Sequence, residues 1–247
     1  MKILKNITVF TMVMLLSVST VLEAREKNIS NFSSSASNLV DSTGTFDGNK
    51  IYADVANNGL FLDYHVSGDS ALEWPKGTGV HSIFQSALWM GATVNGSIRT
   101  IVGDYTQDMG PGPWGGDPLA AVHRIYKVEK SMLASPLDFA DFQEWPVEFG
   151  APWVDVDGDG VYTPLPGGTD HPEFLGDQVL WFVSNDGDPA YKLNFGTSPM
   201  NVEIQTTMFG FDRPDVFGDM VFLKQLVINK GDDDLVDTYM GCLLYTS

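Results

Sequence analysis

Residues 88–105 read LWMGATVNGSIRTIVGDY, and this stretch decides the fold class. From Leu88 to Val94 every second side chain is apolar, which is the period of a strand with one covered face. Asn95-Gly96 follows, and this pair suits a two-residue type I′ turn because both central positions need a positive φ. Ser97–Tyr105 then supplies the returning strand. The stretch therefore predicts an antiparallel β-hairpin.

Strand patterns recur on both sides of this hairpin, separated by Gly, Asn, Asp and Pro turns. One short helix is expected to begin at Ser135 and to end before Pro146. The sequence thus predicts an all-β protein, an antiparallel β-sandwich with long Gly/Pro/Asp-rich loops and one short helix. The further strands are expected at Ile51–Val55 and Leu60–Tyr64 around the turn Asn58-Gly59, at His123–Lys130, Val179–Val183 and Val202–Met208, and at Met220–Asn229 with its return Val236–Met240.

The N-terminus has the features of a secretory signal peptide over residues 1–24. Lys2 and Lys5 precede the apolar stretch Ile7–Val21, and Ala24 is a small residue at a plausible cleavage point. An uncleaved anchor is the alternative. No later stretch is long enough to form a transmembrane segment after signal removal, so we expect a secreted or outer cell surface location.

The remaining chain divides into three parts by composition. Residues 25–48 are expected to form a flexible lead-in, and residues 49–240 the β-sandwich domain. Residues 241–247 read GCLLYTS and resemble translated adapter sequence, so they are interpreted as a non-native tail on a truncated chain. A genuine C-terminus is the alternative. The one cysteine, Cys242, lies in this tail, so an intrachain disulfide is impossible.

The chain is strongly acidic, with a net charge of −18. Without residues 1–24 it keeps 12 basic and 31 acidic residues, a net charge of −19. Such a surface repels nucleic acid and anionic membranes, so neither is expected as a partner. Divalent cations are the natural counter-charge, although acidity also simply keeps an exported protein soluble.

A calcium loop is predicted at residues 155–160, which read DVDGDG. Three carboxylates at every second position, closed by a glycine, match the start of a Ca²⁺ loop. The twelfth position is Pro166, which has no carboxylate, so this is a calcium loop outside an EF-hand. The predicted ligands are Asp155, Asp157, Asp159, the backbone carbonyl of Val161 and, from farther along the chain, Asp170, with Glu173 and Asp177 as other candidates.

Two alternatives concern the acidic residues of this region. A solvated acidic turn without a metal is the alternative to the calcium loop, since Gly and Asp are ordinary turn formers. Residues 185–188 read NDGD and are either a second, weaker metal site or, more simply, a turn.

Catalytic patterns are not found in the sequence. There is no G-x-S-x-G, and His65, His81, His123 and His171 lack the spacing of a zinc site or a triad. These histidines are interpreted as surface or turn residues. Trp74 and Trp114 are candidate carbohydrate-binding residues that would stack on sugar rings, or else aromatic caps over the edge of the core.

Seven segments form a distinctive set: NGLF (58–61), LEWPKG (72–77), ALWMG (87–91), DVDGDG (155–160), PEFLGDQVLW (172–181), FGF (209–211) and GDMVF (218–222). Together they resemble the N-terminal region of large, mostly uncharacterised bacterial surface proteins, which often end in a type IX secretion sorting domain. The resemblance covers roughly residues 50–240 and implies no known activity.

For the function we expect an adhesion or scaffolding role without catalysis, with glycans or surface matrix as partners. The alternative is a carbohydrate-binding region of a secreted polysaccharide-degrading hydrolase.

Overall fold

The computed structural model describes residues 43–63, 70–104, 106–165, 170–194 and 196–246, together with the backbone of residues 8–14. All strand pairs between these residues are antiparallel. The largest sheet has the order β1 (Thr8–Met14), β14 (Val221–Asn229), β13 (Val202–Gly210), β12 (Gln178–Asn185) and β8 (Gly110–Pro111), and β9 (Tyr126–Glu129) also pairs with β12.

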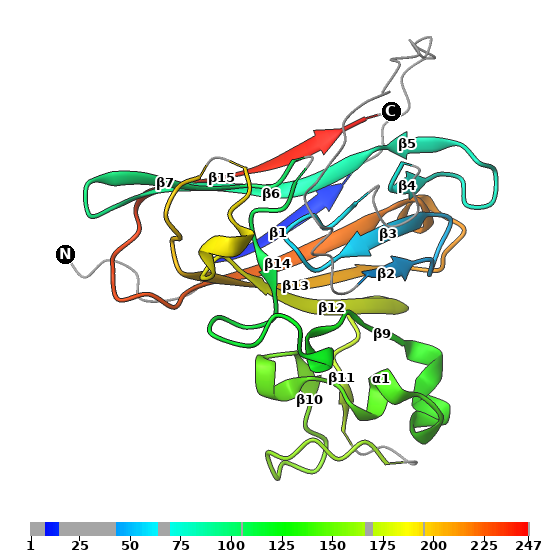
Figure 1. Ribbon diagram of the computed structural model, residues 1–247. Coiled ribbons are helices and arrows are strands. Elements are labelled where there is room, and N and C mark those ends of the chain that lie inside the picture. Colours follow the sequence, from blue (N-terminus) through cyan, green and yellow to red (C-terminus); the bar gives the residue numbers. More distant parts are fainter. Residues whose placement is uncertain are drawn as a thin grey trace.

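Two smaller sheets form the opposite layer of the sandwich (Figure 1). They meet near the isolated bridge between Leu62 and Ser86. The apolar core between the layers includes Phe46, Met90, Leu180 and Ile204, all buried. One sheet consists of β15 (Val236–Tyr245), β6 (Gln85–Val94) and β7 (Ser97–Val102), and the other of β2 (Thr43–Phe46), β3 (Tyr52–Ala56), β4 (Leu72–Glu73) and β5 (His81–Ile83).

A second core covers the outer face of the large sheet, on the side away from β2–β7 (Figure 1). Here Trp181 of β12 packs in one cluster with Phe142 of helix α1 (Ala140–Gln143) and with Trp145. Short 3-10 turns and the pair of β10 (Trp153–Val154) and β11 (His171–Pro172) complete this covering layer. Every residue of β12 is buried, which confirms the expectation of a strand covered on both faces.

The expected hairpin is confirmed. β6 and β7 are paired, with Trp89 opposite Val102 at one end and Val94 opposite Ser97 at the other. In the turn between them, Asn95 and Gly96 have φ values of 50° and 77°. The residues of β6 that face the core are buried at every second position, as the alternation predicts. The all-β class and antiparallel pairing of the sequence prediction therefore hold, with one short helix.

Three local predictions are wrong. Residues 60–63 do not form a strand of a hairpin with β3: Asn58 Oδ1 accepts from Leu60 N, Leu62 forms a bridge with Ser86, and a single hydrogen bond runs from Asp63 N to Asp54 O of β3. Residue 64 lies outside the described residues. The segment His123–Lys130 is a strand only over β9, because 3-10 turns adjoin it. Ser135 precedes a 3-10 turn and makes no side-chain cap, so the helix begins five residues later.

The ends of the domain also differ from expectation. Thr43–Phe46, the last part of the expected lead-in, forms β2 because Phe46 is fully buried in the core. The last expected strand does not return to β14: β15 crosses to β6 and continues through Tyr245, pairing Gly241–Tyr245 of the expected tail with β6. That residues 241–247 are non-native stays a prediction.

Thr8–Met14, within the predicted signal peptide, pairs with the outer edge of β14. Cleavage of the signal peptide stays a prediction, and it would remove the partner of this edge of β14. No helix in the described part of the chain has both the length and the hydrophobicity to span a bilayer.

Candidate functional site

The acidic loop begins and ends at the same point of the covering layer. Val154 of β10 is paired with His171 of β11. Asp155 follows the first strand and Asp170 precedes the second, so antiparallel pairing places these two aspartates opposite each other where the loop begins. Tyr162 anchors the loop to the protein, since its hydroxyl donates to the carbonyl of Phe142 at 2.6 Å.

Four aspartates converge in this loop and could hold a metal ion. One carboxylate oxygen from each of Asp155, Asp157, Asp159 and Asp170 lies within 4.8 Å of the others. Oxygens that share one Ca²⁺ at about 2.3–2.6 Å are at most about 5 Å apart, so the spacing is compatible with a common ion. The structure therefore brings together the four aspartates that the sequence singled out.

Asp170 is the fixed member of this cluster and is only 1% exposed. Its Oδ1 accepts from Val156 N at 2.9 Å, and its Oδ2 accepts from the backbone N–H and the hydroxyl of Thr163 at 2.8 and 3.2 Å. Burial raises the pKa of Asp170, but these hydrogen bonds lower it by more, so the pKa lies below its ordinary value. Asp170 therefore stays ionised at neutral pH.

The other three aspartates are exposed and fold the loop around themselves. Asp155 accepts hydrogen bonds from Gly158 N and Gly160 N at 2.6 and 2.9 Å, and both glycines have positive φ values near 80°. Asp159 accepts from Val161 N at 2.7 Å. The backbone thus takes the tight course that a Ca²⁺ loop needs, and its glycines make that course possible.

Negative charge accumulates at this loop without a protein cation to balance it. The sequence has no Lys or Arg between Lys130 and Lys192, and none of the four aspartates forms an ion pair within the described residues. The hydrogen bond from Asp159 N lowers the pKa of Asp157, but desolvation and the charges of the other three aspartates raise it above its ordinary value overall. A bound cation would relieve this repulsion.

The remaining acidic candidates lie elsewhere. Glu173 is 4.0 Å from Lys224, and Asp177 accepts a hydrogen bond from Asp212 N at 2.9 Å. Asp186 is fully buried and accepts hydrogen bonds from Met200 N and Val202 N. Asp188 accepts a hydrogen bond from Ala190 N. Residues 185–188 therefore form a turn, which was the simpler of the two expectations. These groups are committed to the fold.

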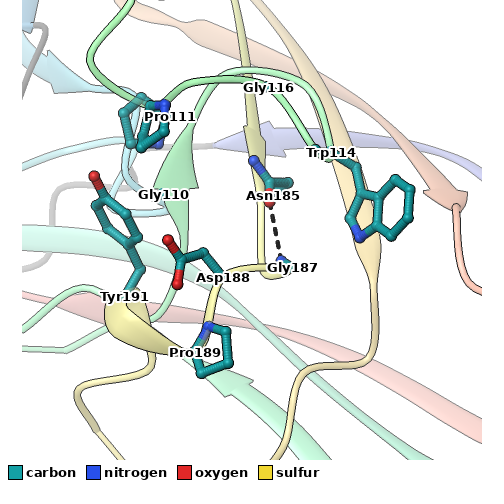
Figure 2. Close-up of a pocket in the computed structure, with 11 residues that line it drawn as sticks. Gly110, Pro111, Trp114, Gly116, Asn185, Gly187, Asp188, Pro189 and Tyr191 are labelled. Carbon is teal, nitrogen blue, oxygen red and sulfur yellow. Dashed lines mark hydrogen bonds between the residues drawn. The ribbon is translucent and has the colours of Figure 1, made fainter.

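The two tryptophans have different environments. Trp74 is partly buried against the main core, and its indole N–H donates to Asp219 Oδ1 at 3.0 Å, as expected of an aromatic cap. Trp114 is 43% exposed and lines a pocket of about 350 Å³ between segments 110–118 and 185–191 (Figure 2). Only Trp114 therefore keeps the surroundings of a sugar-stacking residue.

The described histidines are held by the backbone. Nδ1 of His81, His123 and His171 lies 2.7–3.0 Å from a carbonyl oxygen in each case. His123 is a turn residue, as one of the two expectations had it: it ends the 3-10 turn Ala121–His123 and is buried, and a Cβ at Gly112 would lie 2.4 Å from its ring. His65 lies outside the described residues.

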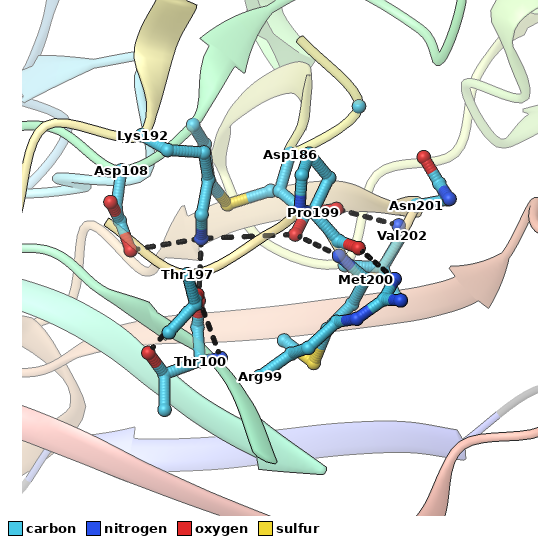
Figure 3. A network of polar contacts seen from close by, with 12 residues as sticks. Arg99, Thr100, Asp108, Asp186, Lys192, Thr197, Pro199, Met200, Asn201 and Val202 are labelled. Atoms are coloured by element: carbon cyan, nitrogen blue, oxygen red, sulfur yellow. Dashed lines mark hydrogen bonds and ion pairs between the residues drawn. The ribbon is translucent and has the colours of Figure 1, made fainter. Parts of the chain in front are cut away.

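One buried group was missed in the sequence. The side chain of Lys192 is 2% exposed, and its Nζ lies 3.0 Å from Asp108 Oδ2 and 3.8 Å from Asp186 Oδ2 (Figure 3). The sequence signal that could have pointed to it is that Lys192 is the first lysine or arginine after Lys130.

Comparison of the chain with protein families, curated proteins and solved structures finds no match.

Proposed function

We propose that the chain is a secreted or cell-surface β-sandwich protein whose acidic loop binds Ca²⁺, and that it serves in adhesion or as a scaffold rather than in catalysis. The four-aspartate cluster is the observation that carries the calcium proposal. The signal-like N-terminus and the acidic composition support export, and the resemblance to type IX secretion substrates supports a surface location.

The loop residues have distinct roles in this proposal. Asp155, Asp157 and Asp159 supply exposed carboxylates, Asp170 supplies a buried one, and the carbonyl of Val161 completes the set. Ca²⁺ accepts six to eight oxygens in variable geometry, whereas Mg²⁺ demands a near-ideal octahedron. A set of four carboxylates and one backbone carbonyl therefore favours Ca²⁺, because Mg²⁺ usually binds through only one or two carboxylates. Binding would stiffen the layer that covers the outer face of the large sheet.

Thermal unfolding of the full chain in Ca²⁺ and in chelator tests this proposal. A ligand at one hundred times its Kd stabilises the native state by about 2.7 kcal/mol. For a chain of this size that corresponds to a rise in Tm of about 5–10 °C. Asp157→Ala should remove most of the rise, whereas Asp232→Ala, an exposed aspartate in the turn before β15, should retain it. Identical melting curves in both conditions would contradict calcium binding.

The second candidate is a carbohydrate-binding region of a secreted polysaccharide-degrading hydrolase. The half-exposed indole of Trp114 beside a pocket favours it, because sugar rings pack their apolar faces on aromatic side chains. A glycan array probed with the full chain and with Trp114→Ala separates the two candidates. Glycan binding that Trp114→Ala abolishes supports the second candidate, whereas binding that survives this substitution, or a blank array, leaves the first.

A further inference from the structure

The pocket beside Trp114 has walls from two segments that are distant in sequence. Trp114 lies on one side, Tyr191 and Pro111 lie on the other, and Gly187 and Asp188 lie between them (Figure 2). Its volume of about 350 Å³ is at the lower end of the range for small-molecule sites, about 300–1,000 Å³. The space suits one sugar ring better than a longer ligand.

The indole of Trp114 is held in one orientation. Its Nε1 donates to Asn201 Oδ1 at 3.3 Å, and its backbone N–H donates to Glu203 Oε2 at 2.9 Å. A Cβ at Gly187 would lie 2.5 Å from the indole, so this glycine lets the ring approach the backbone. An aromatic face that is already fixed loses little conformational entropy when a ligand packs on it.

Asp188 supplies the polar group at the pocket. Its Oδ1 accepts from Ala190 N at 2.8 Å, and its second carboxylate oxygen takes no hydrogen bond from the described residues. Asn185, by contrast, is committed to the walls, since its amide donates to the carbonyl of Gly112 and accepts from Gly187 N, both at 2.9 Å. The exposed carboxylate of Asp188 is therefore the group that can accept hydrogen bonds from ligand hydroxyls.

The negative charge of the pocket disfavours acidic sugars. No Lys or Arg is present among its lining residues. The nearest lysine in the sequence, Lys192, is buried and bound to Asp108. An acidic sugar would place a second negative charge near Asp188 without a counter-charge, in a chain of net charge −18.

A buried ion network positions both walls (Figure 3). Asp108 lies two residues before Gly110, Asp186 lies between Asn185 and Gly187, and Lys192 directly follows Tyr191. The ion pairs of Lys192 with the two aspartates therefore tie the bases of the two pocket segments together. This preorganisation is what a small binding site requires.

We propose that the pocket between Trp114 and Asp188 binds a single pyranose ring without acidic groups, with the ring face on the indole and two hydroxyls on the carboxylate. The inference rests on the proposed glycan-binding candidate and specifies its site and ligand class. Neutral hexoses and amino sugars satisfy it, whereas uronic acids do not.

Titration of the full chain with methyl glycosides of glucose, galactose, mannose and glucosamine, and with glucuronic acid, tests the proposal. At least one non-acidic sugar should bind, and glucuronic acid should bind at least tenfold more weakly. Trp114→Ala should weaken binding at least tenfold. Trp89→Ala is the matched control, because Trp89 is 39% exposed on the separate sheet of β6 and should leave affinity unchanged.

Asp188→Asn keeps the shape of the pocket, removes its charge and lies on the surface, so it also serves if Trp114→Ala fails to fold. It should narrow the difference between the neutral sugar and glucuronic acid to less than threefold. Sugar binding that survives Trp114→Ala, or a preference for glucuronic acid, would overturn this inference but leave glycan binding intact. Absence of binding to every sugar, and to the glycan array, would overturn both.

Discussion

The Nζ of Lys192 lies 3.0 Å from the Oδ2 of Asp108, and both side chains are at most 2% exposed. Asp186, also buried, lies 3.8 Å from the same Nζ. Backbone donors complete the network, because Val102 N donates to Asp108 and Met200 N donates to Asp186. One buried cation is thus shared by two carboxylates, and its loss would leave both without a counter-charge.

Lys192→Met should destabilise the protein severely. Removing one partner of a buried ion pair costs about 3–5 kcal/mol, because the remaining charge stays buried and unpaired. The free energy of unfolding from chemical denaturation should fall by that amount. The double variant Lys192→Met, Asp108→Asn should recover a large part of the loss, since the amide carries no charge and its oxygen can still accept from Val102 N. A single-variant loss below about 1 kcal/mol would show that the network is not energetically coupled.

Asp186 should make the network sensitive to pH. Burial raises the pKa of Asp186, and the hydrogen bonds from Met200 and Val202 and the charge of Lys192 offset only part of this effect. Since the folded pKa lies above the unfolded one, about 3.9, the protonated form favours folding. The contribution is present below the unfolded pKa and is lost as the pH rises through the folded pKa.

Asp186→Asn removes this titration, so the stability of the original protein minus that of the variant should be larger at pH 4 than at pH 7. Denaturant unfolding of both proteins at the two pH values measures this difference. Asp188→Asn is the matched control for the substitution itself, because it makes the same change at an exposed position of the same turn. An increase of the difference between pH 4 and pH 7 would contradict the assigned direction.

Trp74 should contribute to stability and not to sugar binding. Its indole N–H donates to Asp219, which also pairs with Lys50 at 2.9 Å. The hydrogen bonds from Trp74 and Lys50 lower the pKa of Asp219, so their contribution is present above the unfolded pKa and is lost as the pH falls through the folded pKa. Trp74→Phe should therefore lower the free energy of unfolding at pH 7 by about 0.5–1.5 kcal/mol.

The loss in Trp74→Phe should shrink in acid, where Asp219 becomes protonated. Lys50→Met offers a comparison, because an exposed ion pair contributes only about 0–1 kcal/mol. Glycan affinity, if present, should be the same in Trp74→Phe and in the original protein. A selective loss of sugar binding in this variant would reassign Trp74 to a binding site.

Local patterns predicted the parts of the fold that depend on neighbours in sequence. The Asn95-Gly96 turn fixes its hairpin because its two positive φ values are set by the residues themselves. The apolar run Val179–Val183 indicated a strand covered on both faces because no other arrangement buries consecutive side chains in a sheet. The acidic loop was recognised by ligand spacing, and Asp170 by its proximity.

Contacts between distant segments could not be predicted in this way. β15 has the same strand pattern whether it pairs with β14 or with β6, and the packing between the layers decides between them. The pattern at Leu60–Tyr64 is apolar, but Leu62 packs in the main core and forms an isolated bridge with Ser86 instead of pairing in a hairpin. Lys192 was missed because its partners lie 84 and six residues away, at distances that no local period reveals.

Asp170 and Asp157 should differ in what they do without a metal. Asp170 is buried and accepts three hydrogen bonds from Val156 and Thr163, whereas Asp157 is exposed and accepts one from Asp159 N. In chelator, Asp170→Ala should therefore lower the free energy of unfolding by about 1.5–3 kcal/mol, because the donors on Val156 and Thr163 lose a charged acceptor. Asp157→Ala should cost nothing measurable there, since it also relieves repulsion among the carboxylates.

In Ca²⁺ both variants should lose the stabilisation that the ion gives to the original protein, so their curves in Ca²⁺ and in chelator should nearly coincide. Unfolding of the three proteins in both conditions gives the full comparison, and Thr163→Val separates the hydroxyl bond from the backbone bonds of Asp170. If Asp170→Ala were as stable as Asp157→Ala in chelator, the hydrogen bonds of Asp170 would contribute no net stability. Its position would then be set by β10 and β11 alone.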